Sequence, residues 1–380
     1  MRYAALFYHR IWHIRSRVIA RRIIQIMKNI SFVVVVLLVA VGLAAAEIKN
    51  KGWWRNAVFY QVYPRSFMDS NGDGIGDLKG ITSRLQHFNS TGVTAIWLSP
   101  INKSPMNDFG YDISNFTDIA PVFGTLKDID DLLKEAHKIG LKVILDLVPN
   151  HTSDEHPWFE KSVKKEGNYT DYYIWVNGIG KDKKSPPNNW VSVFNGSAWT
   201  YHETRKQFYF HQFLKSQPDL NYRNPVVQEE MKVLLTEAYT SLSNTIKYYN
   251  YGSHVPFNFK FITDADANSN VSQLKNVIDS WINEMPQGTA ANWVMGNHDR
   301  VRLGSRYPGR ADQMIMLEMI LPGVAVTYYG EEIGMVDIPY MKYDVRDGCR
   351  SPFQWDNTTS AVRFFSTDLI PTKTASGFAL

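Results

Sequence analysis

The sequence predicts an α/β fold, an incomplete TIM (β/α)8 barrel, and three observations lead to that prediction. Short apolar runs alternate with stretches in which apolar residues recur at helical spacing, which is typical of parallel strands joined by crossover helices. The apolar runs end in polar side chains, as the strands of such a barrel do at its active face. The chain has 380 residues, enough for one large barrel domain.

Seven of the eight barrel strands can be predicted from these apolar runs. They lie at residues 57–67, 95–100, 142–150, 233–239, 255–259, 292–299 and 324–335. Helical patterns lie between them at residues 78–89, 126–139, 271–285 and 311–321. Gly140, directly after the second helical pattern, is typical of a helix C-terminus.

The alternation stops between residues 152 and 222, a segment rich in Trp, Asn, Tyr and Lys. A small domain inserted after the third strand explains this change. The predicted division is therefore a basic extension and signal peptide at 1–46, the first part of the barrel at 47–151, the inserted domain at 152–222, the second part of the barrel at 223–345, and a tail at 346–380.

The N-terminal segment carries the basic charge of the chain. Residues 1–46 hold seven Lys or Arg and no acid, so the net charge of +4 becomes −3 without them, and nucleic-acid binding loses its main support. An apolar run at 32–46 that ends in three alanines predicts a signal peptide cleaved after Ala46, with Met27 as the natural start. We therefore expect secretion and no stable membrane span. The alternative is an uncleaved signal anchor, although the run is shorter than the roughly 20 residues a span needs.

Two further features agree with secretion. The sequence contains sequons for N-glycosylation, among them those at Asn89, Asn115, Asn168, Asn195, Asn270 and Asn357. Cys349 is the only cysteine, so it can form no intrachain disulfide, and in a secreted chain it suggests a lost partner.

Carboxyl groups at the strand ends point to glycoside hydrolysis. Retaining glycosidases use two carboxyl groups about 5–5.5 Å apart, one as nucleophile and one as general acid. Glu237 follows an apolar run, and burial there would raise its pKa as a general acid requires. The 20 Tyr, 20 Phe and 11 Trp residues suit a carbohydrate site, because aromatic rings stack on the apolar faces of sugars. The alternatives are a salt-bridged Glu237 and, for Asn297-His298-Asp299, a capped turn.

The loop from Asp69 to Asp77 predicts a structural calcium site. Its oxygen-bearing side chains alternate, and the Ile75 carbonyl is one expected ligand. The glutamate that closes an EF-hand loop is replaced by Gly80, so a looser calcium site is expected. The predicted ligands are Asp69, Asn71, Asp73, Ile75 and Asp77. We expect no organic cofactor, since the sequence contains no dinucleotide, Walker, zinc or G-x-S-x-G motif.

Five motifs, in the same order as in the family, resemble the signature regions of the α-amylase superfamily, glycoside hydrolase family 13, and its secreted maltases in particular. The resemblance covers about residues 53–360. The motifs are Asp146-Leu-Val-Pro-Asn150-His151, Gln217-Pro-Asp219-Leu-Asn221, the strand ending in Glu237, Asn297-His298-Asp299 and Gly330-Glu331-Glu332-Ile-Gly-Met.

The resemblance implies an α-glucosidase that releases terminal glucose from maltose-like oligosaccharides. It implies that Glu237 is the general acid/base, that Asp299 hydrogen-bonds the sugar hydroxyls in the transition state, and that His298 lies at the same subsite. It also implies a pocket for one glucose ring, lined by Asp108, Tyr111, His151, Phe194, Phe213, Gln217 and Arg346.

One departure from the family puts activity in doubt. The family carries its nucleophilic aspartate in a Gly-Phe-Arg-x-Asp-Ala motif on the fourth strand, which should lie between Asn221 and Glu237. Here Met231-Lys232 runs directly into the next strand, and no such motif occurs. A second gap is expected near residues 336–344, and the eighth helix and the β-rich C-terminal domain of the family are expected to be absent. Seven strands leave two open edges, or force strands three and five to pair, so we expect a destabilised chain.

Three interpretations follow from this departure. The chain is the product of an alternative splice or incomplete gene of a maltase, a secreted sugar-binding pseudoenzyme, or a membrane-anchored relative resembling the heavy chains of amino-acid transporters. All three predict that this chain does not hydrolyse maltose.

Overall fold

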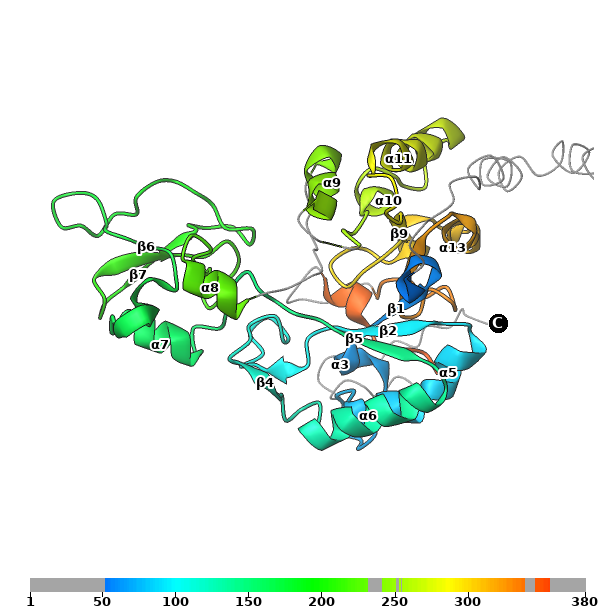
Figure 1. Ribbon diagram of the computed structural model, residues 1–380, viewed down its shortest axis with the longest axis horizontal. Coiled ribbons are helices and arrows are strands. Elements are labelled where there is room, and N and C mark those ends of the chain that lie inside the picture. The colour runs from blue at the N-terminus through cyan, green and yellow to red at the C-terminus, as the bar shows by residue number, and fades with distance from the viewer. Residues whose placement is uncertain (1–51, 232–240, 251–252, 254, 339–345, 356–380) are drawn as a thin grey trace, which may run out of the picture. The chain divides into compact units, whose positions relative to one another are not determined.

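The computed structural model describes residues 52–231, 241–250, 253, 255–338 and 346–355 (Figure 1). The predicted signal peptide, the strand at 233–239 with Glu237, the sequon at Asn357 and most of the tail lie outside the described residues. The chain divides into two compact units. The first unit comprises Met1–Val58, Thr236–Thr327 and Glu331–Asp337, and the second comprises Phe59–Leu235, Tyr328–Gly330 and Ile338–Leu380.

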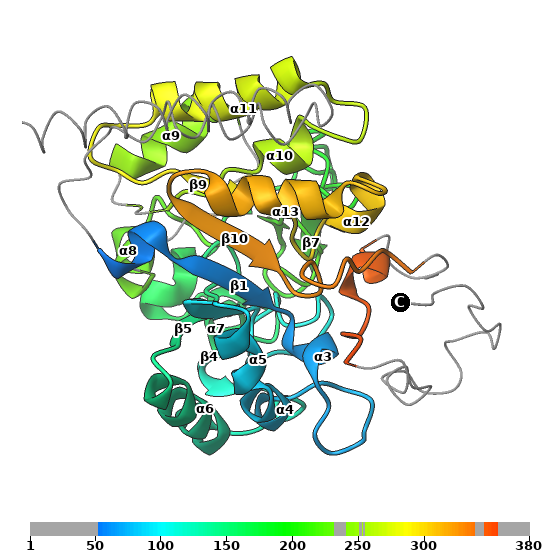
Figure 2. The same ribbon diagram turned by 90° about the vertical axis from the view of Figure 1, so that its right-hand side faces the viewer.

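The second unit contains a parallel sheet in the order β5-β2-β1. Its strands are β1 (Val58–Val62), β2 (Ala95–Leu98) and β5 (Lys142–Leu145). The four residues of β2 are all buried, as expected of a parallel strand covered on both faces. The helices that cross between these strands, α5 (Leu85–Ser90) and α6 (Leu126–Lys138), lie on one side of this sheet in both views (Figures 1 and 2).

Helix α6 forms where the sequence predicts it. Thr125 and Asp128 make a capping box at its N-terminus, and Ile129, Leu132 and Ala136 form its buried face. The predicted helix at 78–89 is instead two short helices, α4 (Leu78–Ser83) and α5, that meet at Arg84. The hydroxyls of Thr82 and Ser83 donate to carbonyls of the preceding turn, and such bonds compete with helix continuation.

The first predicted strand is also shorter than its apolar run. β1 ends at Val62, and a one-turn helix α3 (Pro64–Phe67) follows, because proline suits the first position of a helix and cannot donate to a strand ladder. A two-stranded antiparallel ladder, β3 (Asn102–Lys103) with β4 (Asn115–Ile119), then precedes α6.

Residues 157–231 of the second unit have a different architecture, with no parallel strands among the described residues. A three-stranded antiparallel sheet runs in the order β6-β8-β7, with strands β6 (Trp175–Val176), β7 (Trp199–His202) and β8 (Gln207–Phe210). The helices α7 (Pro157–Val163), η2 (Gly167–Asp171) and α8 (Pro225–Glu230) accompany it. Aromatic residues dominate the core, which contains Phe159, Tyr172, Tyr173, Tyr209, Leu220, Val227 and Met231. Its status as an independent domain stays a prediction.

The first unit contains the parallel pair β9 (Asn292–Val294) and β10 (Val324–Tyr328). Helices α11 (Val271–Glu284) and α13 (Ala311–Ile320) pack with β9 in one apolar cluster centred on Trp281 and Trp293 (Figure 2). The shorter helices are η1 (Trp53–Asn56), α9 (Leu242–Asn250), α10 (Lys260–Thr263) and α12 (Leu303–Arg306), and η3 (Asp347–Arg350) belongs to the second unit.

The strand predicted at residues 255–259 is wrong, because this buried segment forms no ladder. Pro256 has no amide hydrogen to donate to a neighbouring strand. The Asn292 side chain replaces the ladder: its Oδ1 accepts from the Asn258 amide at 2.7 Å, and its Nδ2 donates to the Pro256 carbonyl at 2.7 Å. The parallel strands and crossover helices of the described residues otherwise agree with the predicted part of a barrel. None of the described helices combines the length and apolarity that a membrane span requires.

Candidate functional site

Asp108 is the centre of a polar cluster in the second unit. Asp108 is buried, with 6% of its surface exposed. Arg346 Nη2 donates to Asp108 Oδ1 at 2.9 Å, and Gln217 Nε2 donates to Asp108 Oδ2 at 3.0 Å. Gln217 also reaches the Tyr111 carbonyl at 3.3 Å. Four residues that the sequence predicts for the glucose pocket are therefore in direct contact.

The loop that presents Asp108 is held in an unusual backbone conformation. Phe109 has a φ of 49° and Gly110 a φ of 106°, and a Cβ on Gly110 would come within 2.9 Å of the Pro100 carbonyl oxygen. Asp112, which the sequence analysis did not single out, holds this loop from inside. Its carboxylate accepts from the Ser104 hydroxyl and from the amides of residues 107 and 108, and burial raises its pKa.

His151 is held as a neutral imidazole in one tautomer. Its Nε2 lies 2.9 Å from the Tyr111 carbonyl oxygen, which can only accept, so Nε2 carries the hydrogen. Its Nδ1 lies 3.1 Å from Asn150 Nδ2, which donates to it. Burial lowers the pKa of His151 to about 4, so the ring stays neutral at physiological pH.

Asn150 links His151 to Asp219. Its Nδ2 donates to Asp219 Oδ1 at 3.0 Å, and the Gln212 amide donates to Asp219 Oδ2 at 2.7 Å. Burial raises the pKa of Asp219 to about 7, although these two hydrogen bonds oppose the shift. Asp219 is part of a predicted signature motif but was not among the predicted pocket residues.

Three aromatic or cationic groups complete the cluster. The ring of Phe213 lies 5.3 Å from the ring of His151 and 6.2 Å from that of Phe194. The guanidinium of Arg346 lies 5.0 Å from the centre of the Phe194 ring, within range of a cation–π contact. The structure thus connects all seven predicted pocket residues in one network, although their role in sugar binding is untested.

Asp146 lies next to this network. The Tyr111 hydroxyl lies 3.4 Å from Asp146 Oδ2, directly after the end of β5. Asp146 therefore marks the side of the cluster that is nearest the parallel sheet.

The remaining predicted site residues, two catalytic and one substrate-binding, belong to the first unit or are not described. His298 and Asp299 follow β9, with His298 Nε2 3.5 Å from Asp299 Oδ1. His298 is buried, whereas the Asp299 side chain is 29% exposed. Asn297 Oδ1 accepts from the Asp299 amide at 3.1 Å, as in the capped turn that the sequence allowed. Glu237 lies outside the described residues.

Two more carboxylates of the first unit are buried. The Thr327 hydroxyl donates to Glu331 Oε2 at 2.8 Å. Burial raises the pKa of Glu318, and the nearby Glu331 raises it further.

The predicted calcium loop forms a series of turns in the second unit. Asp69 accepts from the amides of Asn71, Gly72 and Gly74, while Asp77 caps α4 and binds Ser70. Across the described residues, no three His, Cys, Asp or Glu side chains come together closely enough to hold a metal ion. The conformation of the loop therefore fits a calcium site only in part, since Asp77 is turned to the helix.

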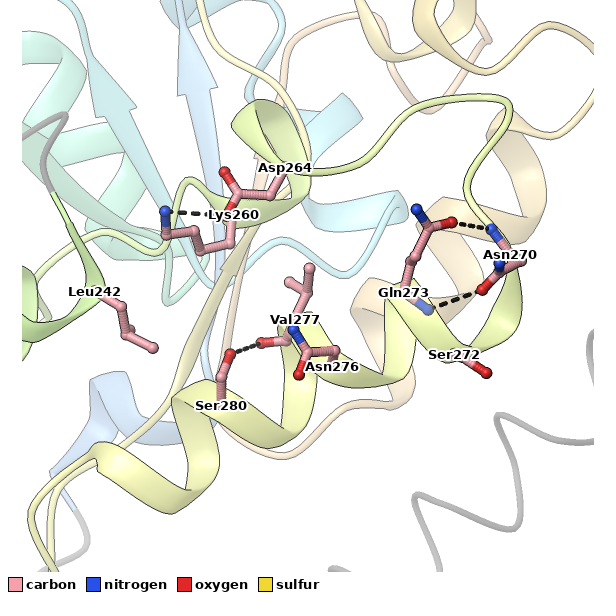
Figure 3. A pocket seen from close by; sticks show the side chains of 9 residues that line it. All are labelled: Leu242, Lys260, Asp264, Asn270, Ser272, Gln273, Asn276, Val277 and Ser280. Carbon is pink, nitrogen blue, oxygen red and sulfur yellow. Dashed lines mark hydrogen bonds and ion pairs between the residues drawn. The ribbon is translucent and has the colours of Figure 1, made fainter.

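A cavity of about 600 Å³ lies in the first unit among α9, α10 and α11 (Figure 3). Lys260 pairs with Asp264 on one side of it, and the capping box of Asn270 and Gln273 lies on the other. None of the predicted site residues lines it. This cavity is therefore not the sugar pocket that the sequence predicts.

The parallel strands, the crossover helices and the acidic, aromatic cluster after β2 and β5 define a glycoside-hydrolase type of α/β barrel. The chain belongs to the α-amylase family. The family "Alpha amylase, catalytic domain" matches it in two segments, residues 61–235 and 232–369, which meet at residues 232–235.

Named relatives agree with this assignment. Maltase 1 of Drosophila virilis is 44% identical over 418 aligned positions, which cover 82% of this chain and 66% of the relative, so the chain spans about two thirds of its length. The alignment has more positions than this chain has residues, so many residues of the relative are aligned with gaps in this chain. A salivary α-glucosidase of Anopheles gambiae is 39% identical, covering 86% of this chain and 75% of the relative.

More distant comparisons point to the same fold. The crystal structure of the isomaltulose synthase SmuA from Protaminobacter rubrum matches with a TM-score of 0.76 at 27% identity, covering 83% of this chain and 77% of that one. The amino acid transporter heavy chain SLC3A1 of Rattus norvegicus is 36% identical over 89% of this chain and 63% of the relative.

Proposed function

We propose that this chain carries the glucose-binding cluster of an α-glucosidase, and that it binds the terminal glucose of maltose-like oligosaccharides without hydrolysing them. The observation that supports binding most strongly is Asp108, a buried carboxylate shared by Arg346 and Gln217. The name and activity of the maltase relatives support the choice of sugar.

The chemistry of the cluster suits a sugar ring. Each carboxylate oxygen of Asp108 has a second lone pair, so the group can accept from sugar hydroxyls while it keeps both protein donors. The guanidinium of Arg346 is positioned by Asp108 and by the Phe194 ring, which places a cationic group in the same cluster. The rings of Phe194 and Phe213 supply apolar surface for the carbon-bound face of the sugar.

The neutral state of His151 suits the same task. A buried imidazolium would carry a desolvation cost, whereas a neutral ring can be buried once both of its nitrogens are hydrogen-bonded. Both nitrogens are already engaged by protein groups, so we assign His151 to shaping the pocket beside Phe213.

The lack of hydrolysis rests on the missing nucleophile. A retaining glycosidase needs a carboxylate to attack the anomeric carbon in addition to the general acid. One finding supports a gap at that place: the two matched family segments overlap at residues 232–235. The alignment with Maltase 1 is longer than this chain, which agrees with a gap but does not locate it. Asp299 does not replace the nucleophile in our proposal, because the resemblance gives it a different side of the sugar.

Secretion and calcium binding are further parts of the proposal. The salivary relative and the sequons support secretion, with cleavage after Ala46. The alternating oxygens of the loop from Asp69 to Asp77 support a structural calcium ion, which has no part in the chemistry. A rise in melting temperature on adding Ca²⁺, lost in Asp73→Asn, is the expected result, and equal melts with Ca²⁺ and with a chelator would remove calcium from the proposal.

The similarity to a transporter heavy chain favours one second candidate, a non-catalytic membrane-anchored relative. The two candidates differ at the N-terminus of the mature protein. Sequencing that begins at Glu47 supports the secreted form, and retention of residues 32–46 supports the anchored form.

The binding proposal is tested by calorimetric titration of the purified chain with glucose. We expect saturable binding that is lost in Asp108→Asn, because the amide cannot satisfy both Arg346 and Gln217 as the carboxylate does. Asp118→Asn, at a half-buried position of β4, is the matched control and should bind as the wild type does. Absence of glucose binding by a folded wild-type chain would refute the proposal.

A further inference from the structure

The most exposed tryptophan of the described residues stands next to the proposed glucose cluster. Trp190 is 56% exposed, whereas Trp199, on which it stacks, is 6% exposed. The two indole rings lie 6.0 Å apart between centroids and 25° from parallel, and the rings of Trp190 and Phe210 lie 5.6 Å apart in a T-shaped arrangement. Because Trp199 occupies one face, the opposite face of the Trp190 ring is turned to solvent.

Asn188 holds this pair of tryptophans rigidly. Its Oδ1 accepts from Trp199 Nε1 at 2.8 Å and from the Trp190 amide at 3.1 Å. The Ala198 amide also donates to the Trp190 carbonyl at 2.9 Å, which ties the two chain segments together. An aromatic ring that is fixed in advance loses little conformational entropy when a ligand stacks on it.

Two hydrogen-bond donors border the exposed ring. Within the described part of the chain, neither Trp190 Nε1 nor Asn188 Nδ2 donates to another residue, and both residues are exposed. A flat apolar face with N–H donors at its rim matches a sugar ring, which has an apolar face and hydroxyls around its edge. A single ring of this kind is far smaller than the roughly 800 Å² per partner that a stable protein interface buries.

The backbone connects this ring to the proposed glucose cluster. Ser192, two residues after Trp190, donates from its hydroxyl to the Phe213 carbonyl at 2.7 Å and accepts from the Phe194 amide at 3.1 Å. Phe194 and Phe213 both belong to the cluster. Two extended residues span about 7 Å, so Trp190 lies within reach of a neighbouring ring of the same oligosaccharide.

We propose that Trp190, backed by Trp199 and flanked by Asn188, is a subsite for a further glucose ring of an α-linked oligosaccharide. The inference rests on the proposed function, because that function places the terminal ring in the Asp108 cluster beside which Trp190 lies. The subsite lengthens the preferred ligand beyond a single glucose unit.

The test is a titration series with glucose, maltose and maltopentaose, carried out on the wild type, Trp190→Ala and Trp190→Phe. We expect maltopentaose to bind more tightly than glucose to the wild type, and Trp190→Ala to weaken maltopentaose binding about tenfold while glucose changes less than twofold. Trp190→Phe should retain most of the affinity. Trp53→Ala, which removes another exposed tryptophan, should leave all three affinities unchanged.

A second readout is fluorescence. Maltopentaose should shift tryptophan emission to the blue in the wild type by covering Trp190, and this shift should be absent in Trp190→Phe, whose melting temperature verifies that it is folded. If the wild type does not bind glucose but its binding of maltopentaose still depends on Trp190, the proposed function is refuted and the subsite is not. Equal affinities of the wild type for glucose and maltopentaose would overturn the subsite. So would a Trp190→Ala variant in which affinity rises with oligosaccharide length as much as in the wild type. Self-association that disappears in Trp190→Ala without any change in sugar binding would overturn it in favour of a protein interface.

Discussion

The side-chain amide of Asn150 donates to Nδ1 of His151 at 3.1 Å and thereby fixes the imidazole as a neutral donor through Nε2. The same amide donates to Asp219, so one side chain sets the state of a histidine beside a titrating carboxyl group. This relationship leads to two predictions about pH.

The first prediction concerns the stability of the chain at acidic pH. The pKa of His151 falls from its ordinary 6.5 to about 4 in the folded chain, so its contribution to stability is present above pH 6.5 and is lost as the pH falls through 4. Between pH 6.5 and pH 4, the free energy of unfolding of His151→Gln should fall by about 2–3 kcal/mol less than that of the wild type. Thermal melts of both proteins across this range measure the difference. Parallel curves would show that His151 does not titrate as we infer.

The second prediction concerns Asp219, whose pKa rises from 3.8 to about 7. Folding favours its protonated form, so its stabilising contribution is complete below pH 3.8 and is lost as the pH rises towards 7. Relative to the wild type, Asp219→Asn should therefore gain stability steadily between pH 4 and pH 7. Melts at four pH values, with the half-buried Asp118→Asn as control, decide this, and a constant offset would contradict it.

A third prediction concerns the pair of Asp108 and Arg346. Their side chains are only 8% and 16% exposed, so removing one partner leaves a charge that is poorly solvated. Arg346→Met should lower the free energy of unfolding by about 2–4 kcal/mol. The double variant Asp108→Asn, Arg346→Met should recover part of this loss, because no charge is then left unpaired. Chemical denaturation of Asp108→Asn, Arg346→Met and the double variant measures the coupling. A loss in the double variant equal to the sum of the two single losses would argue against it.

The fourth prediction concerns the edge of the sheet in the second unit. β5 pairs with β2 in the described ladder, and Leu145 at its end is 51% exposed. An exposed apolar strand end invites pairing with other chains. Leu145→Lys should therefore slow aggregation on mild heating, as light scattering would show. Ile333→Lys, at a similarly exposed site in a turn, is the control and should change little.

The fold was predictable where the signal is local. The capping box of Thr125 and Asp128 and the spacing of Ile129, Leu132 and Ala136 predict α6 almost to the residue. The break at Arg84 and the missing strand at 255–259 were not predictable, because they depend on side-chain bonds from Ser83 and Asn292 that compete with the backbone pattern.

The site was predictable from motifs but not from spacing. Asp108 and Arg346 are 238 residues apart, so only the resemblance to a family could bring them together before the structure did. The support that Asp112 and Asn150 give to the pocket has a weaker signal. Asp112 is an aspartate four residues after Asp108 in a loop with a glycine between them, a pattern that also occurs in ordinary turns.

The central claim is that this chain holds glucose but has no carboxylate to attack its anomeric carbon. The direct measurement is intact-protein mass spectrometry after incubation with a glucosyl fluoride that forms a long-lived covalent intermediate on retaining α-glucosidases. We expect the mass to stay unchanged and maltose to remain intact in the same sample. An added mass of one glucosyl group on the polypeptide would contradict this account.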